Sequence, residues 1–183
     1  IAMAAFVDAL VERRLDWGDL QMLVVPMLNP DGVARGHWRA NRGGIDLNRD
    51  WGGFTQPETR AVKAWLDALP RTVRPVVMLD FHSTQRSLVY VQSDEEMDEA
   101  QRRFRAAWLE GQEQAVPGYP FTLEPRDGNA NSGTTKNWFH RTYGIPAYTY
   151  EVGDTADRAG TRTAAQMLAG RLLNVLNAPA RGE

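Results

Sequence analysis

The sequence contains no cysteine. Disulfides, thiol catalysis and thiolate metal sites are therefore excluded, and any metal ion must be held by His, Asp or Glu side chains. Histidine is also scarce, with three in 183 residues. The absence of cysteine does not identify the cellular compartment. The compartment that we favour is the cytoplasm, with the protein soluble there.

Long apolar runs and a net positive charge are absent as well. No apolar run approaches the roughly 20 residues that a membrane-spanning helix needs. Lysine and arginine total 21 and aspartate and glutamate 23, which gives a formal charge of −2. We therefore expect neither nucleic acid nor a membrane as a partner. The 43% of hydrophobic residues is typical of a globular chain, and the length fits a single domain over residues 1–183.

The spacing of apolar residues predicts helices and strands in alternation. Helices are expected over 2–14, 55–70, 93–114, 138–143 and 162–176, and strands over 20–25, 76–82, 88–91 and 147–152. Thr55 and Glu58 are expected to form a capping box. Residues 29–54 and 117–133 are expected to be long loops, which compact domains keep mainly for function. Strands separated by helices favour an α/β three-layer domain.

Polar side chains end two of the predicted strands. Asp80 and His82 share one face of the second strand because side chains alternate along a strand. Glu151 ends the last strand, where a carboxylate can serve as a general base. The alternative is that both residues are structural: His82 would then be a packing residue, and Glu151 would pair with an arginine.

The first long loop concentrates arginines and asparagines. It opens on an Asn-Pro-Asp-Gly turn sequence at 29–32 and contains Arg39, Arg42, Asn48 and Arg49. Two guanidinium groups and an amide can hold a carboxylate through paired hydrogen bonds. The same residues can equally belong to a solvated loop.

Taken in order, these segments resemble the zinc carboxypeptidases of the carboxypeptidase A-like family. The matching motifs are PMLNPDG at 26–32, WRANR at 38–42, GIDLNRDW at 44–51, LDFHS at 79–83 and YTYE at 148–151. Each motif is weak alone, but five in the family's order are specific. The resemblance implies a three-layer α/β/α fold with a mixed, mostly parallel central sheet, of which the first strands are missing here.

The resemblance also implies a division of roles. His82 matches a zinc ligand, and Glu151 matches the general base that activates water and then protonates the leaving amine. Arg42 matches the arginine that polarises the scissile carbonyl. Asn48 and Arg49 match the pair that grips the terminal carboxylate of the substrate. We expect these side chains to converge on one crevice at the strand ends.

Lys136 indicates the specificity that the resemblance implies. The family position fifteen residues before the catalytic glutamate lines the pocket for the terminal side chain, and Lys136 occupies it. A lysine there favours a C-terminal Glu or Asp. The alternative is a solvated loop lysine.

The sequence departs from the family pattern in its metal ligands. The family takes its other two ligands from an H-x-x-E motif before the NPDG segment, and neither His37 nor His140 is followed by an acid three residues later. We expect the missing ligands upstream of Ile1 and therefore interpret the chain as an N-terminally truncated catalytic domain. Alone, it is expected to hold zinc poorly and to be inactive.

A second departure concerns the tyrosine that caps the substrate in the family. Asn129 occupies its position, and Tyr119 and Tyr143 are the nearest replacements.

The resemblance predicts a zinc-dependent peptidase that removes C-terminal residues, with a preference for an acidic one. Its substrates are peptides and its cofactor is one zinc ion. Two alternatives stay open: an amidohydrolase acting on N-acyl amino acids or cell-wall peptides, and a zinc-free protein that binds peptide C-termini.

Overall fold

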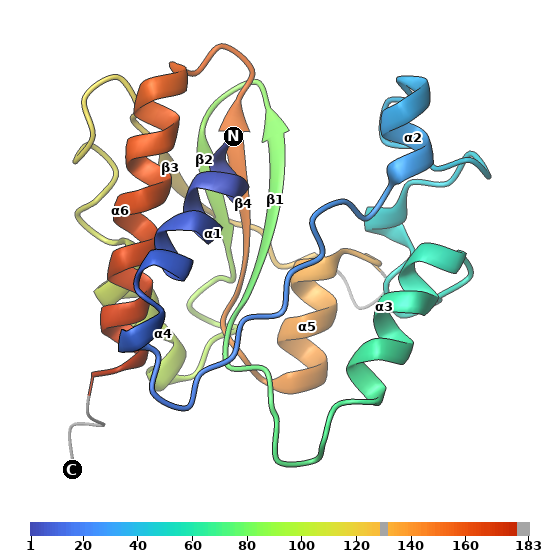
Figure 1. The fold of residues 1–183 in the computed structure, drawn as a ribbon, viewed down its shortest axis with the longest axis horizontal. Helices are drawn as coiled ribbons and strands as arrows, with labels where there is room; N and C mark the ends of the chain where they lie inside the picture. The colour runs from blue at the N-terminus through green and yellow to red at the C-terminus, as the bar shows by residue number, and fades with distance from the viewer. Residues whose placement is uncertain (129–131, 179–183) are drawn as a thin grey trace. The chain divides into compact units, whose positions relative to one another are not determined.

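Four strands form one mixed sheet in the described part of the computed structural model (Figure 1). The structure describes residues 1–128 and 132–178. The strands are β1 (Met78–Thr84), β2 (Leu88–Val91), β3 (Thr122–Pro125) and β4 (Ala147–Gly153). The helices are α1 (Ala2–Glu12), α2 (Pro30–Arg35), α3 (Pro57–Asp67), α4 (Glu99–Leu109), α5 (Thr135–Tyr143) and α6 (Arg158–Leu176), with short 3₁₀ turns at Arg14–Asp16 and Leu47–Arg49.

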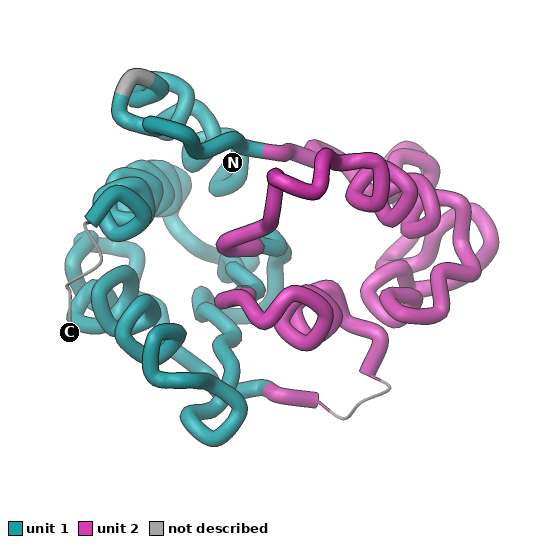
Figure 2. Tube along the Cα trace, turned by 90° about the horizontal axis from the view of Figure 1, so that it is seen from below, with its two compact units in different colours: residues 1–22, 79–126, 148–183 teal, residues 23–78, 127–147 magenta. Residues whose placement is uncertain are grey.

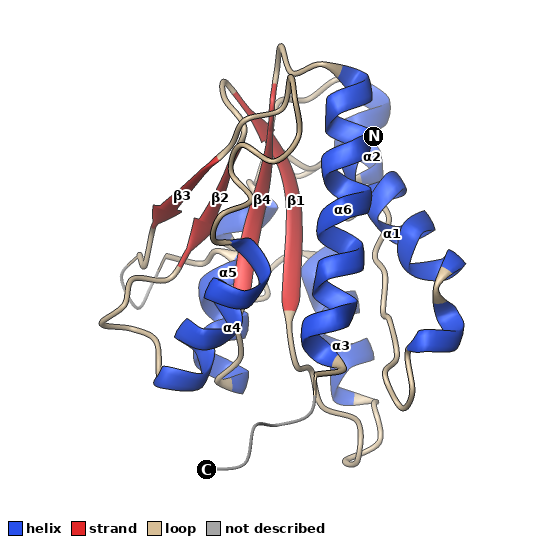
Figure 3. Ribbon diagram, turned by 90° about the vertical axis from the view of Figure 1, so that its left-hand side faces the viewer, coloured by secondary structure: helices blue, strands red, loops and turns tan. Residues whose placement is uncertain are grey.

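The strands follow the order β1-β4-β2-β3, which Figure 3 shows across the sheet. The arrows of β1 and β4 point the same way in Figure 1, β2 runs antiparallel to β4, and β3 runs parallel to β2. Two of the three pairings are therefore parallel. This mixed sheet and its helices confirm the predicted α/β class.

The chain divides into two compact units, coloured separately in Figure 2. Unit 1 comprises residues 1–22, 79–126 and 148–183, and unit 2 comprises residues 23–78 and 127–147. Strands β1 and β4 each begin with a residue of unit 2 and continue in unit 1.

Unit 1 has its core where α1, α4 and α6 meet one face of the sheet. The Phe81 ring lies 5.5 Å from Phe6 of α1 and 5.2 Å from Tyr150 of β4. Trp108 of α4 packs on Tyr148 at 5.0 Å, and its indole N–H donates to the Leu168 carbonyl of α6. Because side chains alternate, Tyr148 and Tyr150 take this face while Glu151 takes the opposite one.

The core of unit 2 consists mainly of aromatic side chains from α5 and from the arginine-rich loop at 29–54. Trp51, Phe139, Ile145 and Ala147 form the buried cluster. The Trp51 ring lies 5.4 Å from the Trp138 ring and 5.6 Å from the Phe139 ring. Helix α5 ends at Gly144, as predicted, in the left-handed conformation that glycine adopts readily.

Several sequence-based expectations about elements were wrong. Residues 20–25 are not a strand, and Leu23, Val24 and Val25 each leave 36–41% of their surface exposed. An apolar run becomes a strand only where a neighbouring strand satisfies its backbone, and the pattern alone does not show the neighbour.

The two predicted loops contain regular structure. The first holds α2, which Asn29 caps by accepting from the Gly32 N–H at 2.9 Å, so NPDG starts a helix instead of a turn. The second holds β3, a short edge strand that ends on Pro125. Proline is tolerated at an edge because no neighbour needs its missing N–H.

Four predicted helix starts also differ, and α5 and α6 begin three and four residues earlier than expected, at Thr135 and Arg158. Thr55 does not cap α3: the helix begins after Gln56, without a side-chain cap, and the Thr55 hydroxyl donates to Asp50 instead. Helix α4 begins later than expected, after a capping box formed by Asp98 and Gln101.

Candidate functional site

His82 and Asp80 lie together on one face of β1, as the alternation predicted. His82 Nε2 is 2.8 Å from Asp80 Oδ2, and about a third of the His82 side chain is exposed. A carboxylate in contact with one ring nitrogen fixes the orientation of an imidazole ring. The ring nitrogen nearest the Asp80 carboxylate is Nε2.

Glu151 lies beside His82 on the neighbouring strand β4. The Met78 N–H donates to the Pro146 carbonyl at 3.1 Å, and the Asp154 N–H donates to the Thr84 carbonyl at 2.8 Å. Both bonds fit one parallel register, which pairs His82 with Glu151. Paired residues of adjacent strands point to the same face about 4.8 Å apart. On the other side of β4, Leu88 of β2 pairs with Glu151.

Burial distinguishes the two members of this pair. Glu151 is only 9% exposed, whereas His82 is partly open to solvent. A carboxylate next to an imidazole at the end of a buried strand can exchange protons with a bound molecule. Unit 1 thus brings His82, Asp80 and Glu151 together.

The arginine-rich loop of unit 2 is organised by buried polar side chains. Asn29 Nδ2 donates to the Ala40 carbonyl at 3.0 Å. Asn41, 2% exposed, accepts from the backbone N–H groups of Gly43 and Ile45 through Oδ1 and donates to Gln56 through Nδ2. These bonds replace the sheet and helix bonds that an irregular segment lacks.

The Asp50 carboxylate accepts four hydrogen bonds from the residues that follow it. It accepts from the Thr55 N–H at 2.9 Å, the Thr55 hydroxyl at 2.6 Å, the Gln56 N–H at 2.9 Å and the Thr59 hydroxyl. Burial raises the pKa of this carboxyl, but the hydrogen bonds from Thr55, Thr59 and Gln56 outweigh burial and lower the pKa of Asp50 to about 2. The motif resemblance assigned no role to Asn41 or Asp50, although both residues lie inside the motifs.

The guanidinium groups of the loop are exposed. Arg42 and Arg49 both lie at the surface of unit 2, and Arg49 Nη1 donates to the Asn48 carbonyl at 2.6 Å. Arg39 has a left-handed backbone (φ 64°), stacks on Trp38 at 4.8 Å and lies 3.7 Å from the Asp46 carboxylate. The loop therefore presents three arginines from a fixed backbone.

Asn48 joins this loop to the start of α5. Its Oδ1 accepts from the backbone N–H of Thr135 at 2.9 Å and from the Thr135 hydroxyl at 3.1 Å. The next residue is Lys136, which is 3% exposed and so is not a solvated loop lysine. Unit 2 thus brings the segments of Asn48, Arg49 and Lys136 together.

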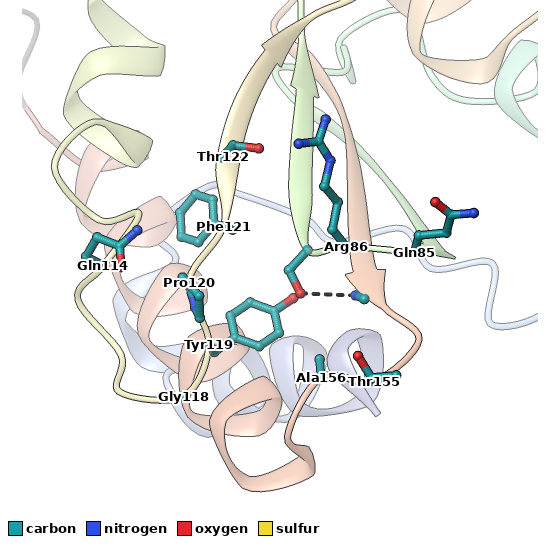
Figure 4. Close-up of a pocket in the computed structure, with 12 residues that line it drawn as sticks. Gln85, Arg86, Gln114, Gly118, Tyr119, Pro120, Phe121, Thr122, Thr155 and Ala156 are labelled. Atoms are coloured by element: carbon teal, nitrogen blue, oxygen red, sulfur yellow. Dashed lines mark hydrogen bonds between the residues drawn. The ribbon is translucent and has the colours of Figure 1, made fainter.

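Neither tyrosine that could replace the family's capping tyrosine is free at the surface of the protein: Tyr119 is buried, and Tyr143 packs in the core of unit 2. Tyr119 is 2% exposed and lines a cavity of about 350 Å³ past the ends of β1 and β4 (Figure 4). Figure 4 shows the Tyr119 ring among the residues that line this cavity, and the dashed line is the bond from the Gly153 N–H to Ser87 Oγ at 3.0 Å. Tyr143 packs on Phe139 in the core of unit 2. Asn129 lies outside the described residues.

Donor chemistry limits what metal this chain can hold. His82, which contacts the Asp80 carboxylate, fits one position in a zinc ligand set. Within residues 1–128 and 132–178, no three His, Asp or Glu side chains cluster closely enough to hold a metal ion. The convergence of Arg42 and Arg49 with His82 and Glu151 stays a prediction.

None of the described helices combines the length and the apolar character needed to cross a bilayer.

Two sequence relatives share segments of this chain. Cytosolic carboxypeptidase 4 of Mus musculus is 42% identical over 73 residues, which cover 37% of this chain and 6% of that protein. Cytosolic carboxypeptidase 6 of Caenorhabditis elegans is 34% identical over 95 residues, which cover 47% of this chain and 20% of that protein. The chain thus spans a small part of the length of these relatives.

Solved structures share the fold. A metallo-carboxypeptidase from Burkholderia cenocepacia superposes with a TM-score of 0.67 at 23% identity, over 94% of this chain and 52% of that one. A Pseudomonas aeruginosa metallo-carboxypeptidase, solved with (2-guanidinoethylmercapto)succinic acid, gives a TM-score of 0.65 at 21% identity with the same coverage. This likeness confirms the predicted three-layer α/β fold.

The family match covers most of the chain. The zinc carboxypeptidase pattern matches residues 12–171, a span that includes all the motifs and candidate residues described above. This chain belongs to the zinc carboxypeptidase family.

Proposed function

We propose that the protein is a zinc-dependent carboxypeptidase that hydrolyses the last peptide bond of a peptide and prefers an acidic terminal residue. Membership of the zinc carboxypeptidase family supports peptide hydrolysis at the C-terminus in general. The single observation that carries the assignment of residues is the register that sets His82 beside Glu151.

The chemistry divides between the metal and the chain. Zinc, when bound, acts as a Lewis acid toward water and the carbonyl group. His82 would provide one ligand, with the Asp80 carboxylate 2.8 Å from its ring. Glu151 takes a proton from the attacking water and delivers it to the leaving amine. Its burial keeps that carboxylate in a defined position.

The residues of unit 2 recognise the substrate. Arg42 polarises the scissile carbonyl, where negative charge develops in the transition state. Arg49 and Asn48 donate hydrogen bonds to the terminal carboxylate. The named ligand of the Pseudomonas aeruginosa structure is a succinic acid, a dicarboxylate, which agrees with a site built for carboxylates.

Lys136 selects an acidic terminal side chain. Opposite charges attract more strongly in a buried site than in water, because the surroundings screen them less. A C-terminal Glu or Asp would bring a carboxylate to this ammonium group. The burial of Lys136, immediately after the residue that contacts Asn48, supports a role beside the carboxylate site.

A substrate panel on the complete protein tests these roles. The panel contains one peptide ending in Glu, the same peptide ending in Leu, their C-terminal amides and an N-acyl amino acid. Lys136→Ala is expected to lower kcat/KM on the Glu peptide at least ten-fold more than on the Leu peptide, because only the Glu side chain loses a charge partner. Lys63→Ala is the matched control, since Lys63 is the other lysine and pairs with Asp67 at 2.6 Å on α3.

The remaining variants of the panel test catalysis. Glu151→Gln is expected to abolish cleavage of both peptides. Arg42→Gln is expected to lower kcat with little change in KM. If Arg39→Gln lowers kcat and Arg42→Gln does not, Arg39 is the residue that polarises the carbonyl. Equal losses of Lys136→Ala on both peptides would reject the acidic preference.

The panel also addresses the alternatives. Cleavage of the N-acyl amino acid alone would indicate an amidohydrolase, and binding without cleavage would indicate a peptide-binding protein. The family match and the cytosolic carboxypeptidases favour neither alternative. Because the matched relatives are named cytosolic, we also propose the cytoplasm as the place of action.

A further inference from the structure

Two bonds from Thr135 fix the side-chain amide of Asn48. The Thr135 backbone N–H and its hydroxyl both donate to one Asn48 atom, at 2.9 and 3.1 Å. A backbone N–H can only donate, so the atom that faces it must be the amide oxygen. The amide nitrogen, with its two N–H donors, must therefore point elsewhere.

The segments that carry these two residues are tied together at several points. The Trp51 N–H donates to the Gly133 carbonyl at 3.0 Å. A Cβ atom built on Gly133 would lie 2.3 Å from the Arg49 carbonyl oxygen, so the two backbones are in direct contact. Thr135 itself is 8% exposed. The contact between Asn48 and Thr135 is thus part of a rigid junction within unit 2.

We propose that Thr135 is a positioning residue for recognition of the substrate's terminal carboxylate. By occupying Oδ1 of Asn48, it directs the Nδ2 donors toward the carboxylate. If the amide rotated by half a turn, its oxygen would face the carboxylate and repel it. This inference rests on the proposed function, because that function assigns Asn48 to the carboxylate.

The hydroxyl contributes separately from the backbone. Thr135→Val keeps the size of the side chain and the backbone N–H but removes the hydroxyl donor. Thr135→Ser keeps the hydroxyl. A neutral hydrogen bond of this kind changes an equilibrium by about two- to twelve-fold. The two variants therefore separate the hydroxyl from the packing of the side chain.

The experiment measures kcat and KM of the complete protein on a peptide with a free C-terminal carboxylate and on its C-terminal amide. Thr135→Val is expected to raise KM for the carboxylate peptide about five-fold with kcat within about two-fold, and to lower the preference for carboxylate over amide. Thr135→Ser is expected to match the wild type. Thr135→Ala gives the same expectation as Thr135→Val and replaces it if the valine variant does not fold.

Two results would overturn the positioning role: a wild-type KM and preference in Thr135→Val and Thr135→Ala, or an equal defect in Thr135→Ser. The cleavage of the two peptides by the wild type tests the proposed function separately. A wild type that cleaves neither peptide, or cleaves both equally well, rejects the carboxylate assignment of Asn48 and the role of Thr135 with it.

Discussion

At the scale of single residues, the motif residues of the first loop perform two different tasks. Asn29, Asn41 and Asp50 turn inward and bind backbone groups of the loop. Arg42 and Arg49 lie at the surface. A short amide or carboxylate can satisfy several backbone donors of an irregular segment, whereas a long guanidinium keeps its charge in water. The inward residues thus hold the backbone from which the arginines project.

Asp50 makes the stability of unit 2 dependent on pH. Its pKa of about 2 in the folded protein lies below the ordinary value of 3.8, so folding favours the ionised form. The resulting stabilisation, about 2 kcal/mol, is fully present above pH about 4 and is lost as the pH falls toward about 2. We expect Asp50→Asn to lower the free energy of unfolding at pH 7 by about this amount, because the amide nitrogen cannot accept from Gln56.

Urea unfolding at pH 7, 4, 3 and 2 measures this effect. The difference between the wild type and Asp50→Asn should shrink steadily below pH 4. Asp67→Asn is the control, since Asp67 is exposed and pairs with Lys63 on the same helix. A difference that stays constant down to pH 2 would contradict the role assigned to the ionised carboxyl.

At the scale of elements, the periodic spacing of apolar residues predicted helices and strands, but it did not predict which strands pair. The sequence predicted α1, β2, α5 and β4 within a few residues, because their apolar spacing or their stop signals are local. It missed β3, whose four residues end on proline and gain their strand geometry from β2. It also placed a strand at 20–25, where only the tertiary environment decides.

The start and the end of α5 provide a matched pair of glycines for a test. Gly133 and Gly144 both have φ of +64°. A Cβ atom at Gly133 would meet the Arg49 carbonyl oxygen at 2.3 Å, whereas one at Gly144 has nothing within 4 Å. We expect Gly144→Ala to lower the free energy of unfolding by about 1 kcal/mol through backbone strain alone.

Gly133→Ala should cost about 1–3 kcal/mol more, because the junction between the loop and α5 must open. Urea denaturation of both variants gives the two values. Equal losses would mean that the two segments separate without cost. Such a result would also argue against a rigid junction between the loop and α5, on which the proposed role of Thr135 depends.

At the scale of the whole molecule, the sequence supplied candidate residues for chemistry but did not specify their neighbours in the fold. Period-two alternation alone placed Asp80 and His82 on one face of their strand, and the structure adds their contact at 2.8 Å. The pairing of His82 with Glu151 depends on the register of two strands far apart in the sequence, which no local pattern specifies. The contact of Asn48 with Thr135 is of the same kind. Motif resemblance supplied the candidates, and long-range pairing supplied their neighbours.

The path of the chain predicts that units 1 and 2 unfold together as one domain. The chain passes between the units at 22–23, 78–79, 126–127 and 147–148, and two of these crossings lie within β1 and β4. A strand that continues from one unit into the other cannot lose its structure in one unit without disturbing the other. Asp50→Asn, a change in unit 2, should therefore weaken both units.

Native-state hydrogen exchange tests this prediction residue by residue. The most protected amides of β2, in unit 1, and of α5, in unit 2, should lose the same free energy of protection in Asp50→Asn, about 2 kcal/mol at pH 7. A loss confined to α5 would show that the units unfold independently. Equal losses mean that a defect in the arginine loop also loosens the strand that carries Glu151, because both then share one folding equilibrium.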